Sequence, residues 1–179
     1  MTHVLLTGGA RSGKSALAVA LAERDGADVV FLATGQPGDD EMAARIARHR
    51  AERPSHWTTV EEPVRLVEAI GAVAPSACLI VDCLSLWVAN LLEAQSAAGV
   101  EGAAAAAADV AAARSGTTIV VTNEVGLGIV PATPLGRGYR DLLGRVNAIW
   151  AGRATEAYLV VAGRLLALLP ATEVLPDGS

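Results

Sequence analysis

Short apolar runs, each ending in a polar residue or a glycine, alternate along this chain with longer stretches of mixed polarity. Such runs predict buried strands, and they fall at Val4–Thr7, Val29–Thr34, Cys78–Asp82, Thr118–Asn123 and Ala157–Ala162. Helical patterns lie between them, and this alternation favours a mostly parallel sheet with helices on both faces. Leu165–Leu169, directly after Gly163-Arg164, predicts a last strand that returns as a hairpin.

The stretches between the apolar runs predict helices over Ala16–Ala22, Asp39–Arg53, from Leu84 onward, and over the alanine-rich Glu101–Arg114. No internal repeat or linker interrupts this order. At 179 residues the chain is long enough for one domain with a sizeable core. We therefore expect a single domain over residues 1–179, in which Pro170–Ser179 forms a loose tail.

The first apolar run breaks into a glycine-rich stretch that matches the pattern G-x-x-x-x-G-K-[ST]. It consists of Gly8, Gly9, Ala10, Arg11, Ser12, Gly13, Lys14 and Ser15. Glycines let the backbone wrap a phosphate chain, and the following helix amino terminus favours an anion. Lys14 would reach the terminal phosphates, and the Ser15 hydroxyl would ligate Mg²⁺. The alternative is a plain glycine turn, but the flanking strand and helix favour a P-loop NTPase of the α/β class with a RecA-like sheet.

A carboxylate closes the third apolar run, CLIVD, at Asp82. Beside a P-loop, an acid at the end of a buried strand is suited to hold the Mg²⁺ shell. The alternative is an aspartate that caps the helix beginning at Leu84. The P-loop favours the metal role.

The predicted helix DDEMAARIARHRAER begins with acids and ends with bases, as the helix dipole prefers. His49 follows Arg45 by one turn and precedes Arg53 by one turn, so the three share one face. An imidazole among guanidinium groups suits an attack on a phosphate, because arginines attract and neutralise the triphosphate. On the residues alone, a solvated basic face that includes one histidine is the favoured interpretation.

Four residues stand at the carboxyl ends of predicted strands, where open α/β sheets bind ligands: Gly8, Thr34, Asp82 and Asn123. The stretch TNEVGLGIVP, residues 122–131, would face the nucleotide there, although a plain connection is the alternative. Arg137, Arg140 and Arg145 follow, and a solvated helix face explains them better than anion binding.

The composition limits the function classes. The formal net charge of −5 disfavours an electrostatic grip on nucleic acid, and no apolar run is long enough to span a membrane. The first strand begins so early that we expect no signal peptide. Cys78 and Cys83 are expected to be small core residues rather than a disulfide. Together these features predict a cytoplasmic protein.

Several stretches together resemble one family, the bifunctional adenosylcobinamide kinase/adenosylcobinamide-phosphate guanylyltransferases of cobalamin biosynthesis. They are TGGARSGKS at 7–15, DDEMAARI at 39–46, Arg53-Pro-x-His56-Trp57, VTNEVG at 121–126 with GIVP at 128–131, and GRVN at 144–147. The stretches run in order from the first strand to past the fourth, and their co-occurrence is far more specific than a P-loop.

The resemblance implies two reactions. In the first, ATP or GTP phosphorylates the aminopropanol hydroxyl of adenosylcobinamide. In the second, GMP passes from GTP to that phosphate by way of a histidine, giving adenosylcobinamide-GDP and pyrophosphate. The histidine at the family's position is His49. The resemblance further implies a corrinoid substrate and a homotrimer.

The family's nucleotide contacts would fall on Gly8–Ser15, on three residues after the second strand, and on residues around and beyond the histidine. Besides the P-loop, the implied set is Gly35, Gln36, Pro37, Arg50, Ala51, Glu52, Arg53, Glu61 and Asp82.

Three rival functions stay open at this point. A monofunctional P-loop kinase would need no covalent histidine. A regulatory GTPase switch usually carries Asn-Lys-x-Asp after a strand, whereas this chain has Thr-Asn-Glu-Val at 122–125. A RecA-like ATPase acting on DNA is disfavoured by the acidic balance.

Overall fold

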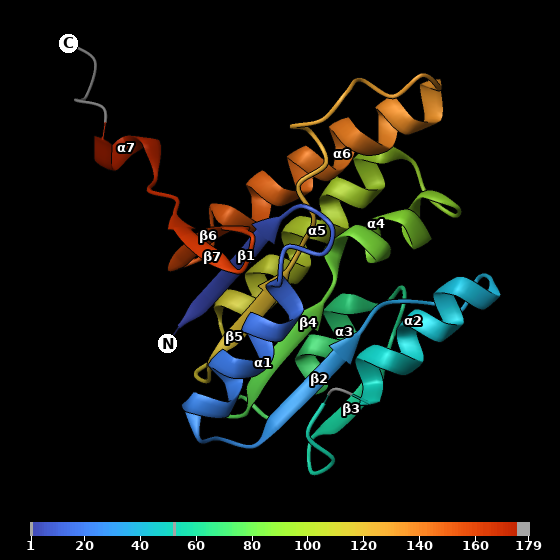
Figure 1. The fold of residues 1–179 in the computed structure, drawn as a ribbon. Coiled ribbons are helices and arrows are strands. Elements are labelled where there is room, and N and C mark those ends of the chain that lie inside the picture. Colours follow the sequence, from blue (N-terminus) through green and yellow to red (C-terminus); the bar gives the residue numbers. More distant parts are fainter. Residues whose placement is uncertain (1, 52, 175–179) are drawn as a thin grey trace.

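One seven-stranded sheet organises the computed structural model, which describes residues 2–51 and 53–174 (Figure 1). The strands are β1 His3–Gly8, β2 Val29–Ala33, β3 Thr58–Glu61, β4 Cys78–Asp82, β5 Thr118–Val121, β6 Glu156–Val161 and β7 Arg164–Ala167. Their spatial order is β3-β2-β4-β5-β1-β6-β7. All neighbouring strands are parallel except β6 and β7, which form the predicted antiparallel hairpin.

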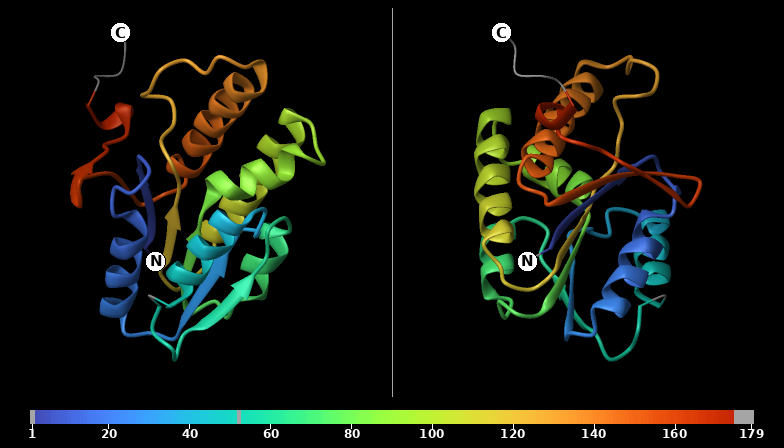
Figure 2. Two further views of the ribbon diagram at one scale, coloured as in Figure 1. Left: turned by 45° about the vertical axis from the view of Figure 1, so that its right-hand side comes forward. Right: turned by 90° about the vertical axis from the view of Figure 1, so that its left-hand side faces the viewer.

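Helices cover both faces of the sheet, as Figure 2 shows with the sheet seen nearly edge-on. The helices are α1 Lys14–Asp25, α2 Asp40–Ala51, α3 Leu66–Ala72, α4 Leu84–Leu92, α5 Ala97–Ala112, α6 Pro134–Ala151 and α7 Ala171–Val174. Helices α1 and α2 lie on one side, and α3 to α6 lie on the other. This layered α/β arrangement is the predicted fold class.

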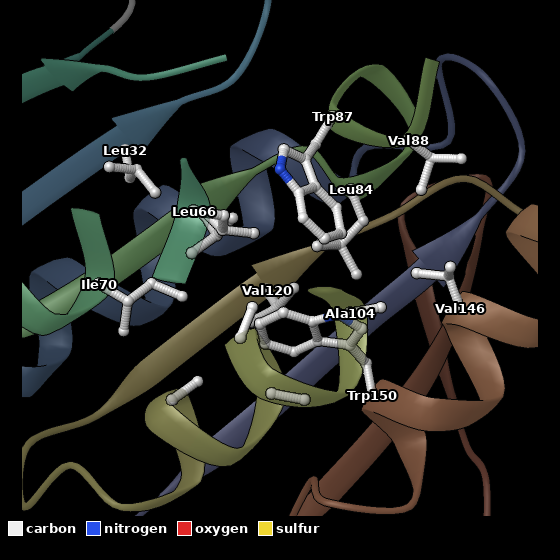
Figure 3. Close-up of a cluster of buried hydrophobic side chains, with 14 of the residues drawn as sticks. Leu32, Leu66, Ile70, Leu84, Trp87, Val88, Ala104, Val120, Val146 and Trp150 are labelled. Atoms are coloured by element: carbon white, nitrogen blue, oxygen red, sulfur yellow. The ribbon is translucent and has the colours of Figure 1, made fainter. Parts of the chain in front are cut away.

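Each face of the sheet has its own hydrophobic core, because parallel strands are buried on both sides. The larger core lies under α3 to α6, where Trp87 and Trp150 are 1% and 0% exposed (Figure 3). The smaller core packs Ala18 and Ala22 of α1 onto β1, β4 and β5. The small side chains of α1 allow a close approach of helix to sheet.

The strand order brings the nucleotide-binding candidates to one edge of the sheet. β1, which carries the P-loop, pairs with β5 and β6, and β5 separates it from β4. Since these strands are parallel, their carboxyl ends meet at the same edge. Gly8, Asp82 and the chain after Val121 are therefore neighbours.

The structure adds elements to those expected from the pattern, among them β3, α3 and α7. Strand β3 and helix α3 were not predicted, because TTVE is a short, partly exposed edge strand and α3 has only seven residues. The described part of the expected tail contains α7, and residues 175–179 lie outside the described range. Cys78 and Cys83 are free and buried, as expected. Among the described helices, none is long and apolar enough to cross a membrane.

Candidate functional site

The P-loop turns sharply at two glycines. Gly8 has φ +150°, and a Cβ there would lie 2.3 Å from the carbonyl oxygen of Val160 in β6. Gly13, at the amino terminus of α1, has φ +101°. Both conformations are rarely open to residues with a side chain. The loop therefore needs glycine at both positions to curl over the end of the sheet and point into α1.

Lys14 lies folded against the loop that precedes it. Its Nζ donates to the carbonyl oxygens of Gly8 at 2.9 Å and Gly9 at 2.7 Å. Burial lowers the pKa of Lys14 below its usual value; Cys83 and Asp82 raise it, and Arg45 lowers it further. An ammonium group held by backbone carbonyls can exchange these acceptors for phosphate oxygens, so Lys14 is positioned to bind an anion.

Two adjoining cavities open beside the P-loop. The first, about 620 Å³, is the P-loop cavity, and residues 11–16 form part of its wall. The second, about 300 Å³, is the side cavity, which lies between α2 and the ends of β2, β3 and β4. The residues common to both walls are Ser15, Arg45, His49, Arg53, Asp82 and Cys83. The predicted phosphate loop, basic helix face and strand-end acid thus form one site.

Helix α2 brings His49 to this site. The helix has no fully buried residue, and both its basic residues and its apolar Met42 and Ile46 border the cavities. His49 is half-buried and lies in the cavity walls with Arg45 and Arg53, as their one-turn spacing predicted. Arg45 is exposed and His49 and Arg53 are half-buried, and all three border the cavities.

Arg53 and Arg50 take different environments at the end of α2. The guanidinium of Arg53 lies 3.6 Å above the centre of the Phe31 ring. Burial lowers the pKa of Arg53, and the negative charge of Asp82 opposes this shift. Arg50 is exposed and pairs with Glu61 of β3 at 3.1 Å. Arg53 is therefore a cation held at the common wall of the two cavities, and Arg50 pairs with the Glu61 carboxylate.

Asp82 does not cap the helix that follows it. Residue Cys83 occupies the cap position of α4 without a side-chain cap, and Asp82 lies in the walls of both cavities. The carboxylate and the Ser15 hydroxyl both border this space, and both are oxygen ligands of the kind Mg²⁺ prefers. Among residues 2–51 and 53–174 no cluster of three or more His, Cys, Asp or Glu could hold a metal ion. A metal here would need further oxygens from the nucleotide.

Some of the remaining residues predicted to contact the nucleotide border one of the two cavities, and others border neither. Gly35 and Pro37 border the side cavity together with Arg50 and Glu61. The predicted residues that border neither cavity are Gly8, Gly9, Ala10, Gln36 and Ala51, and Glu52 lies outside the described residues. Gly8 and Gly9 act through their carbonyl groups on Lys14. Arg137, Arg140 and Arg145 lie on α6 and border neither cavity; Arg145 is exposed, as a solvated face requires, whereas Arg137 and Arg140 are half-buried.

Thr34 differs from the expectation that it faces a ligand. It is fully buried, and its hydroxyl donates to Cys83 O at 2.7 Å and accepts from Cys83 N at 2.9 Å. Asn90 of α4 in turn donates to the carbonyl of Thr34 at 2.9 Å. These bonds fix the chain directly after Asp82. A polar residue at the end of an apolar run was visible in the sequence, but its partners were not.

A second set of polar residues joins β5, α4 and α6 behind the P-loop cavity. Asn123 donates from Nδ2 to Ser85 Oγ at 2.9 Å, and Asn147 donates to the carbonyl of Asn123 at 3.0 Å. Thr122 donates to Asn147 at 2.7 Å. Asn123 also borders the P-loop cavity, which agrees with the expectation that the stretch after β5 faces the site.

The comparisons with known proteins point to one family. The CobU family, described as cobinamide kinase / cobinamide phosphate guanyltransferase, matches residues 4–168. The bifunctional adenosylcobalamin biosynthesis protein CobP of Pseudomonas aeruginosa is 44% identical over 160 residues, covering 89% of this chain and 92% of the relative. The proteins named CobU from Escherichia coli and Salmonella typhimurium are 43% and 42% identical over 174 residues, each covering 89% of this chain and 96% of the relative.

Among solved structures, an ATPase of a bacterial type III secretion system aligns with 88% of this chain at 14% identity and a TM-score of 0.47. The chain spans about half, 51%, of that protein's chain. The fold of this chain is established by its own P-loop geometry and strand order, and not by that alignment. With a family match over residues 4–168 and 42–44% identity to curated relatives, the chain belongs to the cobinamide kinase / cobinamide phosphate guanyltransferase family of bifunctional enzymes.

Proposed function

We propose that this chain phosphorylates adenosylcobinamide with ATP or GTP and then transfers GMP from GTP to the product through His49. The products of the second reaction are adenosylcobinamide-GDP and pyrophosphate. The observation that carries the proposal is the common wall of the two cavities, where His49 meets the P-loop serine and the strand-end acid. A kinase that used only the P-loop would have no use for a histidine there.

The chemistry of GMP transfer follows from this placement. A neutral imidazole nitrogen attacks the α-phosphorus of GTP, a nitrogen–phosphorus bond forms, and the bond from the α-phosphorus to the bridging oxygen breaks. Pyrophosphate leaves with the electron pair of that bond. An oxygen of the corrinoid phosphate then attacks the same phosphorus and displaces His49. Splitting one transfer into two displacements is the advantage of covalent catalysis.

The cations around the cavity would stabilise both displacements. Lys14, Arg45 and Arg53 border the space in which the phosphates would lie, and charge neutralisation there supplies much of the rate of phosphoryl transfer. Ser15 and Asp82 would hold Mg²⁺, which when bound shields the charge of the phosphates.

The side cavity suits the purine base of GTP. Its wall combines the apolar side chains of Ile46, Leu86 and Met42 with the carboxylate of Glu61, in addition to Asp82, which it shares with the P-loop cavity. A flat ring packs between apolar groups, and a carboxylate accepts hydrogen bonds from the N1 and N2 groups of guanine. Arg50 holds this carboxylate in place at 3.1 Å.

The test is incubation of the purified protein with Mg²⁺ and α-³²P-labelled GTP, followed by denaturing electrophoresis. A phosphoramidate on histidine gives a label that acid removes and alkali leaves. We expect this label on the wild-type protein and none on His49→Ala. His56→Ala is the matched control, since His56 is exposed and borders neither cavity.

A label that persists in His49→Ala would exclude His49 as the nucleophile. Transfer of the γ-phosphate to cobinamide without any protein label would reduce the proposal to a kinase. From the family resemblance we further propose a homotrimer that acts in the cytoplasm, and light scattering of the purified protein checks the oligomeric state.

A further inference from the structure

Asn123 borders the P-loop cavity, but the two displacements at His49 give it no role. It follows β5, the strand that lies between the P-loop strand β1 and the Asp82 strand β4. Its side chain borders the P-loop cavity together with Lys14, Ser15 and Asp82. A side chain at this position reaches the space where the γ-phosphate of a bound nucleotide would lie.

The surrounding structure holds Asn123 in one orientation. Asn147 donates to its backbone carbonyl at 3.0 Å, and its own Nδ2 donates to Ser85 Oγ at 2.9 Å. Ser85 is buried, and its Oγ lies 2.9 Å from Cys83 Sγ. The hydroxyl of Tyr139 donates to the backbone carbonyl of Ser85 at 2.9 Å. Because one N–H of the amide nitrogen donates to Ser85, the amide oxygen of Asn123 points away from Ser85 and is left for another partner.

The free atom of this amide is an acceptor. Within residues 2–51 and 53–174, no hydrogen-bond donor contacts Oδ1 of Asn123. An amide oxygen repels phosphate oxygens, which are acceptors too, and it bonds instead to an O–H group. In a kinase the O–H group that must approach the γ-phosphate is the hydroxyl of the acceptor alcohol.

We propose that Oδ1 of Asn123 accepts a hydrogen bond from the acceptor hydroxyl of cobinamide and orients it for in-line attack in the kinase step. This inference rests on the function proposed above. The hydroxyl oxygen bonds to the γ-phosphorus while the bond to the bridging oxygen breaks, and ADP or GDP leaves. The proton passes to an oxygen of the transferred phosphoryl group, since an amide is no base. Orientation of this kind is the main contribution a protein makes to a loose phosphoryl transfer.

The position of Asn123 also separates the kinase step from the capture of GMP. His49 belongs to α2, which follows β2 on the far side of β4, whereas Asn123 follows β5 beside the P-loop (Figure 1). The chain beyond Asn123 carries exposed apolar side chains, among them Leu127 at 81%, Ile129 at 97% and Leu135 at 78%. An acceptor with a large apolar body is better accommodated on this side than beside the charged face of α2.

The test compares the two half-reactions in Asn123→Ala. We expect kcat for phosphorylation of cobinamide by ATP to fall by about 30-fold or more, as misplaced reactants do. Labelling of His49 by α-³²P-labelled GTP should stay within about twofold of wild type, because it needs no acceptor alcohol; this readout also verifies that the variant is folded. Asn123→Ser, which keeps a polar group but removes the carbonyl oxygen, should lose the kinase step as well.

Ser85→Ala tests the positioning role of Ser85, and we expect a smaller fall in the same kcat, about three- to tenfold, with unchanged His49 labelling. Gln95→Ala is the matched control, an exposed amide in the connection between α4 and α5 that borders neither cavity. It should leave both half-reactions unchanged.

Two results would overturn the assignment. One is a kinase kcat in Asn123→Ala within about threefold of wild type. The other is a parallel loss of kinase activity and His49 labelling together with a raised Mg²⁺ requirement, which would place Asn123 in the metal shell. A wild-type protein that labels His49 but phosphorylates no cobinamide would instead remove the kinase half of the proposed function and this inference with it.

Discussion

At the scale of single residues, we propose that nucleotide selectivity in this site depends on Glu61. It is exposed, pairs with Arg50 of α2, and is the one of the two carboxylates bordering the side cavity that the P-loop cavity does not share. A carboxylate accepts from both the N1–H and the N2 amino group of guanine, whereas adenine has an acceptor at N1. Single hydrogen-bonding groups of this kind separate substrates that share shape and size.

We expect Glu61→Gln to raise the KM for GTP in His49 labelling by about tenfold, because the amide replaces one acceptor by a donor. The KM for ATP in the kinase step should change little. The rate of His49 labelling at a series of GTP concentrations and the steady-state kinetics of the kinase step with ATP check this. Glu68→Gln, on exposed surface of α3 away from both cavities, serves as the control. Equal changes for GTP and ATP would show that Glu61 does not select the base.

At the level of secondary structure, one buried guanidinium joins three elements. Arg114, which follows α5, is 6% exposed and donates to the carbonyl oxygens of Ile70, Val73, Ala74 and Ala77 at 2.8–3.4 Å. These carbonyls lie at the end of α3 and in the turn that leads into β4. The side chain thus satisfies carbonyl groups that the end of a short helix leaves open.

Arg114→Met keeps much of the side chain's length but leaves those buried carbonyls without a donor. We expect the free energy of unfolding to fall by about 3 kcal/mol or more. Urea unfolding followed by circular dichroism measures it. Arg145→Met is the control, since Arg145 pairs with Glu101 on the surface and such pairs contribute about 0–1 kcal/mol. Equal losses in the two variants would contradict the role given to Arg114.

At the scale of the whole molecule, the first strand meets the carboxyl end of α6 at His3. This residue is 4% exposed, its Nδ1 lies 3.1 Å from the carbonyl of Arg153, and its ring meets Trp150 edge-on at 5.7 Å. Burial lowers the pKa of His3 below 6.5, and the bond to Arg153 opposes this only in part. The folded protein therefore keeps His3 neutral at pH values where the unfolded chain already binds a proton.

The sign of the pH effect follows from this difference. Between the lowered pKa and 6.5 the unfolded state binds more protons, so this contribution to stability is lost as the pH falls below 6.5. We expect His3→Asn, whose amide nitrogen can still donate to Arg153, to have a smaller loss of unfolding free energy between pH 7 and pH 5 than wild type. Urea unfolding at both pH values measures the two losses. If wild type and His3→Asn lose the same unfolding free energy between pH 7 and pH 5, His3 does not contribute to the pH dependence.

Much of the fold could be predicted because its parallel strands are buried on both faces. Such strands form unbroken apolar runs, and β1, β2, β4 and β5 have this pattern, whereas β6 was found by its apolar run although only Val160 in it is buried. β3 could not be found in this way, since it is a short edge strand with two exposed residues. Likewise Arg114 looked like an ordinary polar end of a helix, and only its burial identifies its role.

The sequence by itself determined the P-loop, the acid at the end of β4 and the one-turn spacing of Arg45, His49 and Arg53, because each depends on residues close together in the chain. The tertiary structure decided which strand ends meet: the placing of β5 between β1 and β4 brings Asn123 beside Lys14 and Asp82. It also turned Thr34 away from the site to bond Cys83. These contacts join residues far apart in sequence, so only the packing of the strands and helices could fix them.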